Sequence, residues 1–380
     1  MATDFLAANL RRLREARRLT QAELAEAAGL SRVGYRNIES GESVPRVATL
    51  EGLAASLGVE LRDLLAPVAE LRQVRFRAMK RLNDRAQILA GVARWLDDFN
   101  WLEDLLEEKP PSLDLQQRDD PDPEAAAAAA RKKLKIGREE PIRDICGLLE
   151  ARGIKVFPTR RASASFFGLS VGPGDGGPAV VVNTWERISV ERWIFTAAHE
   201  LGHLVLHPGD YDVTELVEEE LRELEANLFA AHFLMPDGVF CKEWQETGGL
   251  PFIDRVLKVK RIFRVSYKTV LHRLSNRLGG NVNVWARFQA DYKRRHGKTL
   301  LKEEEPEALS ADAFAASFPE SRRSGEPHEL SPADFREDRL WLLVRRAVES
   351  GAISLGRGAE ILNLSTREMR ALSSSWIGST

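Results

Sequence analysis

The stretch His199-Glu200-Leu201-Gly202-His203 decides how the rest of this 380-residue sequence is interpreted. Histidines four residues apart lie on one face of a helix, where both imidazoles can bind a single metal ion. A glutamate directly after the first histidine can take a proton from water at that metal, as in zinc peptidases. Residues 191–198 and 204–206 continue the helical spacing of apolar side chains. The sequence therefore predicts a helix with the metal ligands His199 and His203 and the general base Glu200.

A catalytic zinc normally has three protein ligands, and a second predicted helix offers the third. Glu225 lies beside the apolar stripe of that helix, which consists of Leu221, Leu224, Leu228, Phe229 and Phe233. Several other glutamates precede it, so Glu225 could instead be one more charge on an acidic face. We expect it to be the third ligand because the upstream motif is intact. Asn227, in the same helix, is expected to orient a ligand histidine.

Peptide hydrolysis also needs a group that stabilises the oxyanion formed on the attacked carbonyl. His207 follows His203 by four residues and therefore lies on the metal-binding face of the predicted helix. It is our first candidate for this catalytic role, ahead of Tyr211 and His232. The alternative for all three side chains is a supporting or packing role.

Four stretches follow one another in an order that resembles the ImmA/IrrE metallopeptidases over about residues 130–280. They are residues 179–183, 195–207, 225–231 and 234–236. The resemblance implies zinc ligands at His199, His203 and Glu225, with Glu200 as general base. It also implies an intracellular regulatory protease that cuts repressors of the helix-turn-helix type. Zinc is the expected metal and manganese the alternative. His232 departs from the family, which more usually has an acidic or neutral residue there.

The N-terminal region carries a second pattern, of short helices that begin and end at recognisable caps. Thr20 and Glu23 form a capping box, and Gly29 ends that helix. A further helix over residues 31–40 begins at a serine cap and ends before Gly41. Two short helices joined by a glycine turn are typical of helix-turn-helix proteins. Residues 3–65 resemble the XRE/Cro family of phage repressors, which implies a five-helix DNA-binding domain.

Within that resemblance, the helix over residues 31–40 would enter the major groove. Arg32, Val33 and Asn37 are expected to face base edges, and Gln21 and Arg46 to contact phosphates. Arg14 and Glu39 are expected to form a structural ion pair. Residues 1–65 carry nine basic and nine acidic side chains, so binding of an operator would depend on a local basic patch and on a homodimer. The alternative is a domain used only for protein contacts.

Composition places the chain in a reducing compartment. Two cysteines, Cys146 and Cys241, argue against a disulfide-rich fold, and neither has the spacing of a metal site. No apolar run approaches membrane-spanning length, and the N-terminus lacks the apolar region of a signal peptide. We expect a cytoplasmic, nucleoid-associated bacterial protein without a membrane partner.

We predict a mainly α-helical protein with a small β-sheet (α+β). The expected parts are the DNA-binding domain 1–66, a helical connector 67–108, a hinge 109–123, the peptidase domain 124–280, a basic then acidic linker region 281–333, and a helical module 334–380. Residues 71–106 are expected to form one or two amphipathic helices. Strands are expected at 154–157, 165–169 and 179–182, with an exposed edge that could hold a peptide by strand addition.

Residues 255–302 contain fourteen basic side chains and a single acid, Asp291. This stretch could contact phosphates, or it could pack against the acidic residues 97–108 or 215–225. The C-terminal module is expected to pack or to recognise a partner.

Together these features predict a zinc metalloendopeptidase that also binds double-stranded DNA and controls a stress-response or mobile-element gene set. Its substrate would be a repressor-like or toxin-like protein, or its own helix-turn-helix domain, cut in the hinge. The alternative is a non-proteolytic repressor or antitoxin whose metal site senses or is structural. A housekeeping peptidase is disfavoured by the fused repressor-like domain.

Overall fold

The computed structural model of the protein describes residues 6–7, 9–11, 13–14, 19–59, 61–65, 71, 74–78, 85–111, 122–137, 140–163, 165–208, 220–279, 283–301, 304–306 and 329–376. Most of the expected hinge, Tyr211 and about half of the expected linker lie outside these residues. The chain forms two units, one of residues 1–71 with 82–99 and one of residues 72–81 with 100–380. No helix among the described residues is long and apolar enough to cross a membrane.

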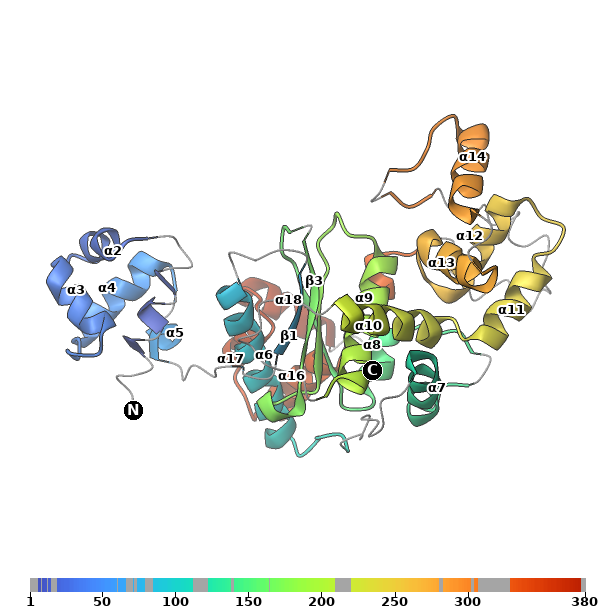
Figure 1. The fold of residues 1–380 in the computed structure, drawn as a ribbon. Coiled ribbons are helices and arrows are strands. Elements are labelled where there is room, and N and C mark those ends of the chain that lie inside the picture. Colours follow the sequence, from blue (N-terminus) through green and yellow to red (C-terminus); the bar gives the residue numbers. More distant parts are fainter. Residues whose placement is uncertain are drawn as a thin grey trace. The chain divides into compact units, whose positions relative to one another are not determined.

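Within residues 19–65, the described part of the first unit contains four short helices (Figure 1). They are α2 (Gln21–Ala27), α3 (Arg32–Glu39), α4 (Val47–Leu57) and α5 (Leu61–Leu65), preceded by helical residues among 6–14. Thr20 Oγ accepts the Glu23 N–H, and the Glu23 carboxylate accepts the Thr20 N–H, which completes the predicted capping box. Tyr35 and Leu53, both fully buried, belong to one apolar core that joins these helices.

The expected helical connector differs from the structure in its first part. Residues Val74–Ala78 form strand β1, and only Arg85–Leu105 form a helix, α6. The sequence of β1 alternates apolar and basic residues, which is the period of a strand. Its partner is β3 (Phe166–Val171), nearly a hundred residues later in the chain. This long-range pairing was not evident from local helical spacing.

The second unit is built on a four-stranded sheet with the order β1-β3-β4-β2. Strands β2 (Lys155–Thr159), β3 and β4 (Ala179–Asn183) occur where the sequence predicted strands. β3 is antiparallel to both of its neighbours, and β2 runs parallel to β4. β3 and β4 are buried along their whole length, so the sheet forms part of a core rather than a surface.

One helix packs on this sheet, a second helix packs on the first, and the two together carry the motif residues (Figure 1). α9 (Val190–Leu206) begins at the cap Ser189 and packs on β3 and β4, and α10 (Glu220–Leu234) packs on α9. Gly202 allows the close approach of these helices, because a β carbon there would lie 3.0 Å from Phe229 Cδ1. The preceding helices are α7 (Pro123–Lys133), which packs on α10, and α8 (Ile145–Glu150).

The remaining helices form two groups. α11 (Asp237–Glu246), α12 (Phe252–Phe263), α13 (Tyr267–Arg277) and α14 (Val284–His296) contact one another, and α16 (Arg339–Glu349), α17 (Leu355–Ile361) and α18 (Thr366–Trp376) form the C-terminal module. Glu150 Oε2 accepts the backbone N–H groups of Asp338 and Arg339, at 3.2 and 3.1 Å. The Arg339 guanidinium donates to Glu103. Buried acids therefore anchor the start of this module.

Candidate metal centre and DNA-binding helix

Three potential ligand atoms converge where α9 packs on α10. His199 Nε2 and His203 Nε2 lie 3.0 Å apart, and a Glu223 carboxylate oxygen lies 3.3 and 3.0 Å from them, respectively. Tetrahedral zinc with bonds of 2.0–2.1 Å would separate its ligand atoms by about 3.3 Å. The residue types and their spacing therefore fit a divalent cation such as zinc, and these three residues form one group able to hold an ion.

The third potential ligand in this group is the Glu223 carboxylate, where the sequence led us to expect Glu225. The expectation depended on an apolar stripe that included Leu221 and Leu224, but these two side chains are 65% and 54% exposed. The buried face of α10 consists of Ala226, Phe229, Ala230, Phe233 and Leu234. Glu223 precedes Ala226 by three residues and Glu225 precedes Phe229 by four, so both carboxylates border this face, and Glu223 is the one that meets the two histidines. The error was thus in the phase of the helix.

Glu225 and His207 instead form a layer behind His203. His207 Nδ1 lies 3.0 Å from His203 Nδ1, and His207 Nε2 lies 2.8 Å from the Glu225 carboxylate. The expected oxyanion role of His207 does not fit this arrangement, because both of its ring nitrogens already face a protein partner. Asn227 occupies the corresponding position behind the other histidine, with Oδ1 3.1 Å from His199 Nδ1. This is the location expected of a residue that orients a ligand.

Burial and hydrogen bonding favour the protonation states that metal ligands need. Burial is the main cause that lowers the pKa of His203 to about 4; the hydrogen bond with Glu223 opposes this shift, and the positive charge of Arg75 adds to it. Burial alone would raise the pKa of Glu223, but hydrogen bonds with His199 and His203 bring it well below its usual range. A neutral imidazole and an ionised carboxylate are the forms that bind a cation. Glu200, the expected base, directly follows His199 in the sequence, and its side chain is fully buried.

His232 lies outside the metal cluster. Its Nε2 is 2.6 Å from Arg273 Nη1, and its Nδ1 is 3.4 Å from Glu124. Arg273 also pairs with Asp237, so this second group of potential ligands already contains a guanidinium. Both ring nitrogens of His232 thus face polar partners away from the metal cluster.

The exposed surface of α3 carries several of the residues expected to read DNA. Arg32 and Val33 are exposed, Asn37 is half-buried, and Arg46 is exposed just before α4. Arg36, which the sequence analysis did not select, is also exposed, one turn after Arg32. Helical spacing was the signal that could have identified it.

Gln21 has a different environment from the one expected. Its Nε2 donates to Glu39 Oε2 at 2.9 Å, so the amide is held inside the domain rather than presented to a phosphate. The same buried carboxylate accepts hydrogen bonds from Arg14, at 2.6–3.2 Å. The expected pairing of Arg14 with Glu39 is therefore present, with Gln21 as a third member.

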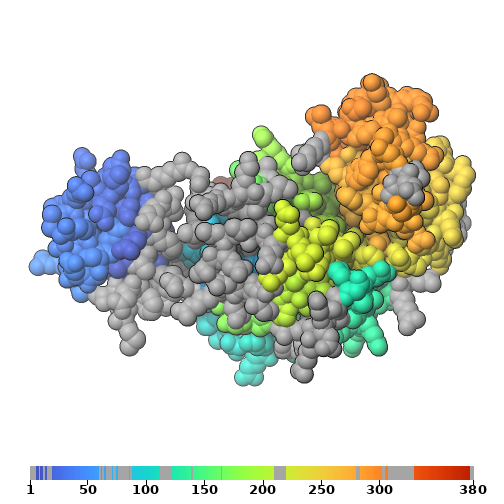
Figure 2. Space-filling model, in the orientation of Figure 1, coloured from blue at the N-terminus to red at the C-terminus, as the bar shows by residue number. Residues whose placement is uncertain are grey.

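Much of the basic charge in residues 255–302 is used within the fold. Arg255 donates to the Trp244 carbonyl, Lys260 pairs with Glu191 and Glu305, and Arg264 pairs with Asp334. None of these partners belongs to the acidic stretches 97–108 or 215–225. Basic side chains of α14, coloured orange in Figure 2, remain at the surface, where Arg287 is 60% and Arg294 is 78% exposed.

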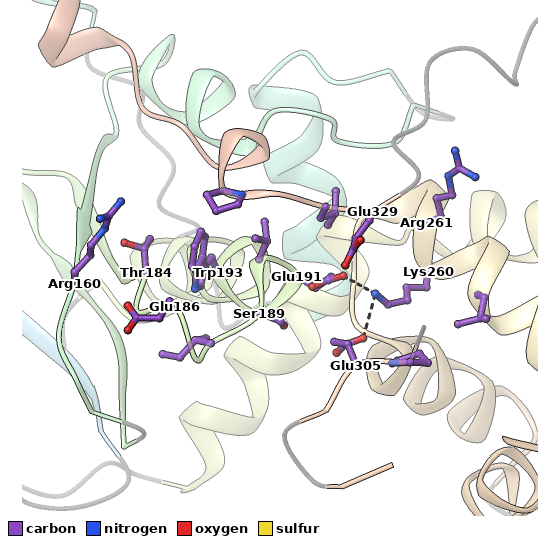
Figure 3. Close-up of a pocket in the computed structure, with 16 residues that line it drawn as sticks. Arg160, Thr184, Glu186, Ser189, Glu191, Trp193, Lys260, Arg261, Glu305 and Glu329 are labelled. Carbon is purple, nitrogen blue, oxygen red and sulfur yellow. Dashed lines mark hydrogen bonds and ion pairs between the residues drawn. The ribbon is translucent and has the colours of Figure 1, made fainter. Parts of the chain in front are cut away.

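A cavity of about 440 Å³ lies at the opposite, N-terminal end of α9 (Figure 3). Its central feature is Lys260, whose Nζ lies 2.5 Å from Glu191 and 3.1 Å from Glu305. Trp193 lines the same cavity, and none of the three clustered ligands does. The cavity and the ligand cluster are therefore two separate features of α9.

Comparisons with known proteins agree with both halves of this description. Residues 149–275 match the model of the IrrE N-terminal-like domain, and residues 10–64 match a helix-turn-helix model. No curated protein matches the chain significantly. The structure of Bacillus thuringiensis PlcR in complex with the peptide PapR7 and DNA is 13% identical over 96% of this chain and 90% of that chain, with a TM-score of only 0.16. The family matches confirm both resemblances: the chain joins a helix-turn-helix domain of the XRE type to a metallopeptidase domain of the ImmA/IrrE family.

Proposed function

We propose that this protein is a DNA-binding regulatory metalloendopeptidase, which controls transcription by cutting a repressor-like protein. The observation that carries the proposal is the convergence of His199, His203 and Glu223 within 3.0–3.3 Å, directly beside Glu200 in sequence. The helix-turn-helix domain in the same chain favours a regulatory role over general protein turnover. A stress-response or mobile-element gene set is the proposed target.

In this proposal His199, His203 and Glu223 hold zinc, and Glu223 replaces Glu225 as the third ligand. A zinc ion at this position supplies Lewis acidity, which makes water nucleophilic near neutral pH and polarises the peptide carbonyl. Glu200 takes the proton of the attacking water and delivers it to the leaving amine. Its complete burial suits this role because a dry site strengthens the interaction between the base and the water.

His207 and Glu225 are proposed to fix the tautomer of His203. If Nε2 of His203 is a ligand, its proton resides on Nδ1, which then donates to His207 Nδ1. The proton of His207 consequently resides on Nε2 and is donated to Glu225. Asn227 Oδ1 accepts the Nδ1 proton of His199 in the same way. Each ligand histidine thus has one acceptor that holds its ring in place.

The DNA-binding half of the proposal depends on α3. Arg32, Val33, Arg36 and Asn37 lie on the side of α3 that faces away from the buried Tyr35 and Ile38. We propose that these four residues read base edges and that Arg46 contacts a phosphate. A homodimer on a double-stranded operator would supply the affinity that one weakly charged domain lacks.

The first experiment compares new protein N-termini in cells that express the wild-type chain or Glu200→Gln, with and without DNA damage. A product seen only with the wild type would identify both the activity and its substrate. Both proteins should bind zinc and DNA equally, because Glu200 is not a ligand. If no product depends on Glu200 while zinc and DNA binding persist, the protein is a repressor or antitoxin whose metal site senses or is structural.

A pair of variants tests the ligand assignment. Glu223→Gln should lose zinc at micromolar concentrations, whereas Glu225→Gln should retain it, because the glutamine carbonyl can still accept from His207. The reverse result would restore Glu225 as the ligand. Zinc content after dialysis against a chelator measures both outcomes.

A further inference from the structure

Strand β1 occupies an edge that would otherwise be open. It is the outermost strand next to β3 in the order β1-β3-β4-β2, and it pairs antiparallel with β3 from Val74 opposite Val171 to Ala78 opposite Phe166. Without β1, β3 would expose a row of unpaired backbone groups, which is the kind of edge that accepts an extended peptide. The sequence led us to expect an exposed edge in this sheet. On the outer side of β3, strand β1 of the same chain occupies that edge.

β3 also lies close to Glu200, the proposed catalytic base. A β carbon built on Gly168 of β3 would lie 3.1 Å from Glu200 Oε1 and 2.6 Å from Thr196 Cγ2. The strand and the helix therefore approach each other closely, with the Gly168 side of β3 facing α9. An extended chain paired with β3 on its free side would run past the ligand cluster. β1 is that chain in this structure.

One basic side chain of β1 lies on the α9 side of the sheet. Arg75 lies opposite Ser170, which is two residues from Gly168 and so on the same face of β3. Arg75 is only 9% exposed, and its Nε has no hydrogen-bond partner among the described residues. A buried guanidinium is therefore held on the face of the sheet that meets α9, without a complete set of acceptors.

From these contacts we infer that β1 occupies the place of a substrate strand, and that a substrate must displace it to pair antiparallel with β3. The inference rests on the proposed peptidase function and names its substrate class: an extended segment that takes the register of β1 opposite β3. β1 then acts as a built-in competitor. A substrate could instead add to the outer edge of β1, and the experiments below separate these two arrangements.

A reversible disulfide tests whether β1 must leave. Val74 and Val171 are register partners on the face of the sheet turned away from α9, so Val74→Cys with Val171→Cys changes little volume and leaves the catalytic face intact. The background carries Cys241→Ser, because Cys241 is the more exposed of the two natural cysteines. The oxidised chain should bind no substrate strand, and reduction should restore binding to the level of the parent. Equal binding in both redox states would overturn the inference.

The probe is a fluorescein-labelled peptide that copies residues 71–82, measured by anisotropy on the zinc-loaded, full-length Glu200→Gln protein so that nothing is cut. Val74→Asp, which places a charge at a buried position of β1, should release the strand and tighten binding at least about tenfold. If Val74→Asp fails to fold, the redox pair alone still decides the question.

The site of binding can be read from a cross-link. In the Val74→Asp background with Val171→Cys, a peptide with cysteine at the position of Val74 should form a disulfide with the protein, as the native register requires. A peptide that adds outside β1 would not reach Val171, and that result would contradict displacement. A scrambled peptide of the same composition is the control for nonspecific attraction.

Failure of the inference and failure of the proposed function give different results. If peptide binding follows the state of β1 but no peptide is ever cut with Glu200 intact, displacement stands and the peptidase proposal falls. If a peptide is cut equally by the oxidised and reduced chains, the peptidase proposal stands and displacement falls.

Discussion

Gly202 provides a direct test of whether the contact between α9 and α10 builds the metal centre. In Gly202→Ala, the new β carbon would lie 3.0 Å from Cδ1, 3.2 Å from Cγ and 3.3 Å from Cβ of Phe229. Ordinary contacts between carbon atoms are about 3.5–4.0 Å, so the helices must separate by roughly half an ångström. The ring cannot easily turn aside, because Phe229 is fully buried and stacks on Phe233 with centroids 5.6 Å apart.

The expected loss of stability combines two opposing effects. Overpacking a core costs about 1–3 kcal/mol. Alanine in place of glycine within a helix recovers up to about 1 kcal/mol. We expect a net decrease of about 1–2 kcal/mol in the free energy of unfolding. Because Phe229 and Glu223 share α10, the displacement should also pull Glu223 away from both histidines and weaken zinc binding by about tenfold, as changes around metal ligands commonly do.

Denaturant unfolding of the zinc-free protein, followed by tryptophan fluorescence, measures the first effect, and competition with a chelator measures the second. Gly238→Ala is the matched control, because a β carbon at Gly238 in α11 would meet nothing within 4 Å. This control should gain about 0.5–1 kcal/mol of stability and keep zinc binding unchanged. If Gly202→Ala is as stable as Gly238→Ala and binds zinc like the wild type, the close contact with Phe229 does not position Glu223.

Three further predictions follow from other contacts. His207→Phe removes the acceptor for the Nδ1 proton of His203 and should lower zinc affinity by about 10–100-fold. His207→Asn, whose Oδ1 can replace the ring nitrogen, should recover most of this affinity. Equal losses of affinity for both variants in chelator competition would indicate that His207 acts by packing alone. Burial raises the pKa of Glu150 to about 7 despite the backbone N–H groups of Arg339 and Asp338, so the folded state binds this proton more tightly than the unfolded state. Stability from this group is therefore present below about pH 4.5 and is lost as the pH rises towards 7, by at most about 3 kcal/mol. Glu150→Gln should remove this slope between pH 5 and 8 in denaturant unfolding of the zinc-free chain, and an unchanged slope would assign it to other groups. Arg32→Ala and Arg36→Ala should each weaken operator binding by about 1–3 kcal/mol while α3 persists by circular dichroism, and unchanged affinity for a selected operator would exclude base contacts by that residue.

The parts of the structure that could be predicted from the sequence are those fixed by neighbouring residues. The helix that carries His199 and His203 follows from spacing within a few turns, and α2 follows from its capping box at Thr20. Strands β2 to β4 follow from short apolar runs between turns. In each case, the determining residues lie within about ten positions of one another. The position of β1 depends instead on a partner strand at the far end of another segment.

The third ligand shows the same limit at the scale of one helix. Leucines at 221 and 224 give α10 an apparent apolar stripe, yet both are exposed, and the smaller Ala226 and Ala230 are buried where α9 approaches. Small residues permit the close packing that places Glu223 against the two histidines, so the decisive feature was the size of the side chains as well as their polarity. A search of α10 for alanine at helical spacing, with an acid one turn earlier, would have selected Glu223. Glu225, two residues later, then faces His207, and the two glutamates take different parts in one site because α10 turns about 100° per residue.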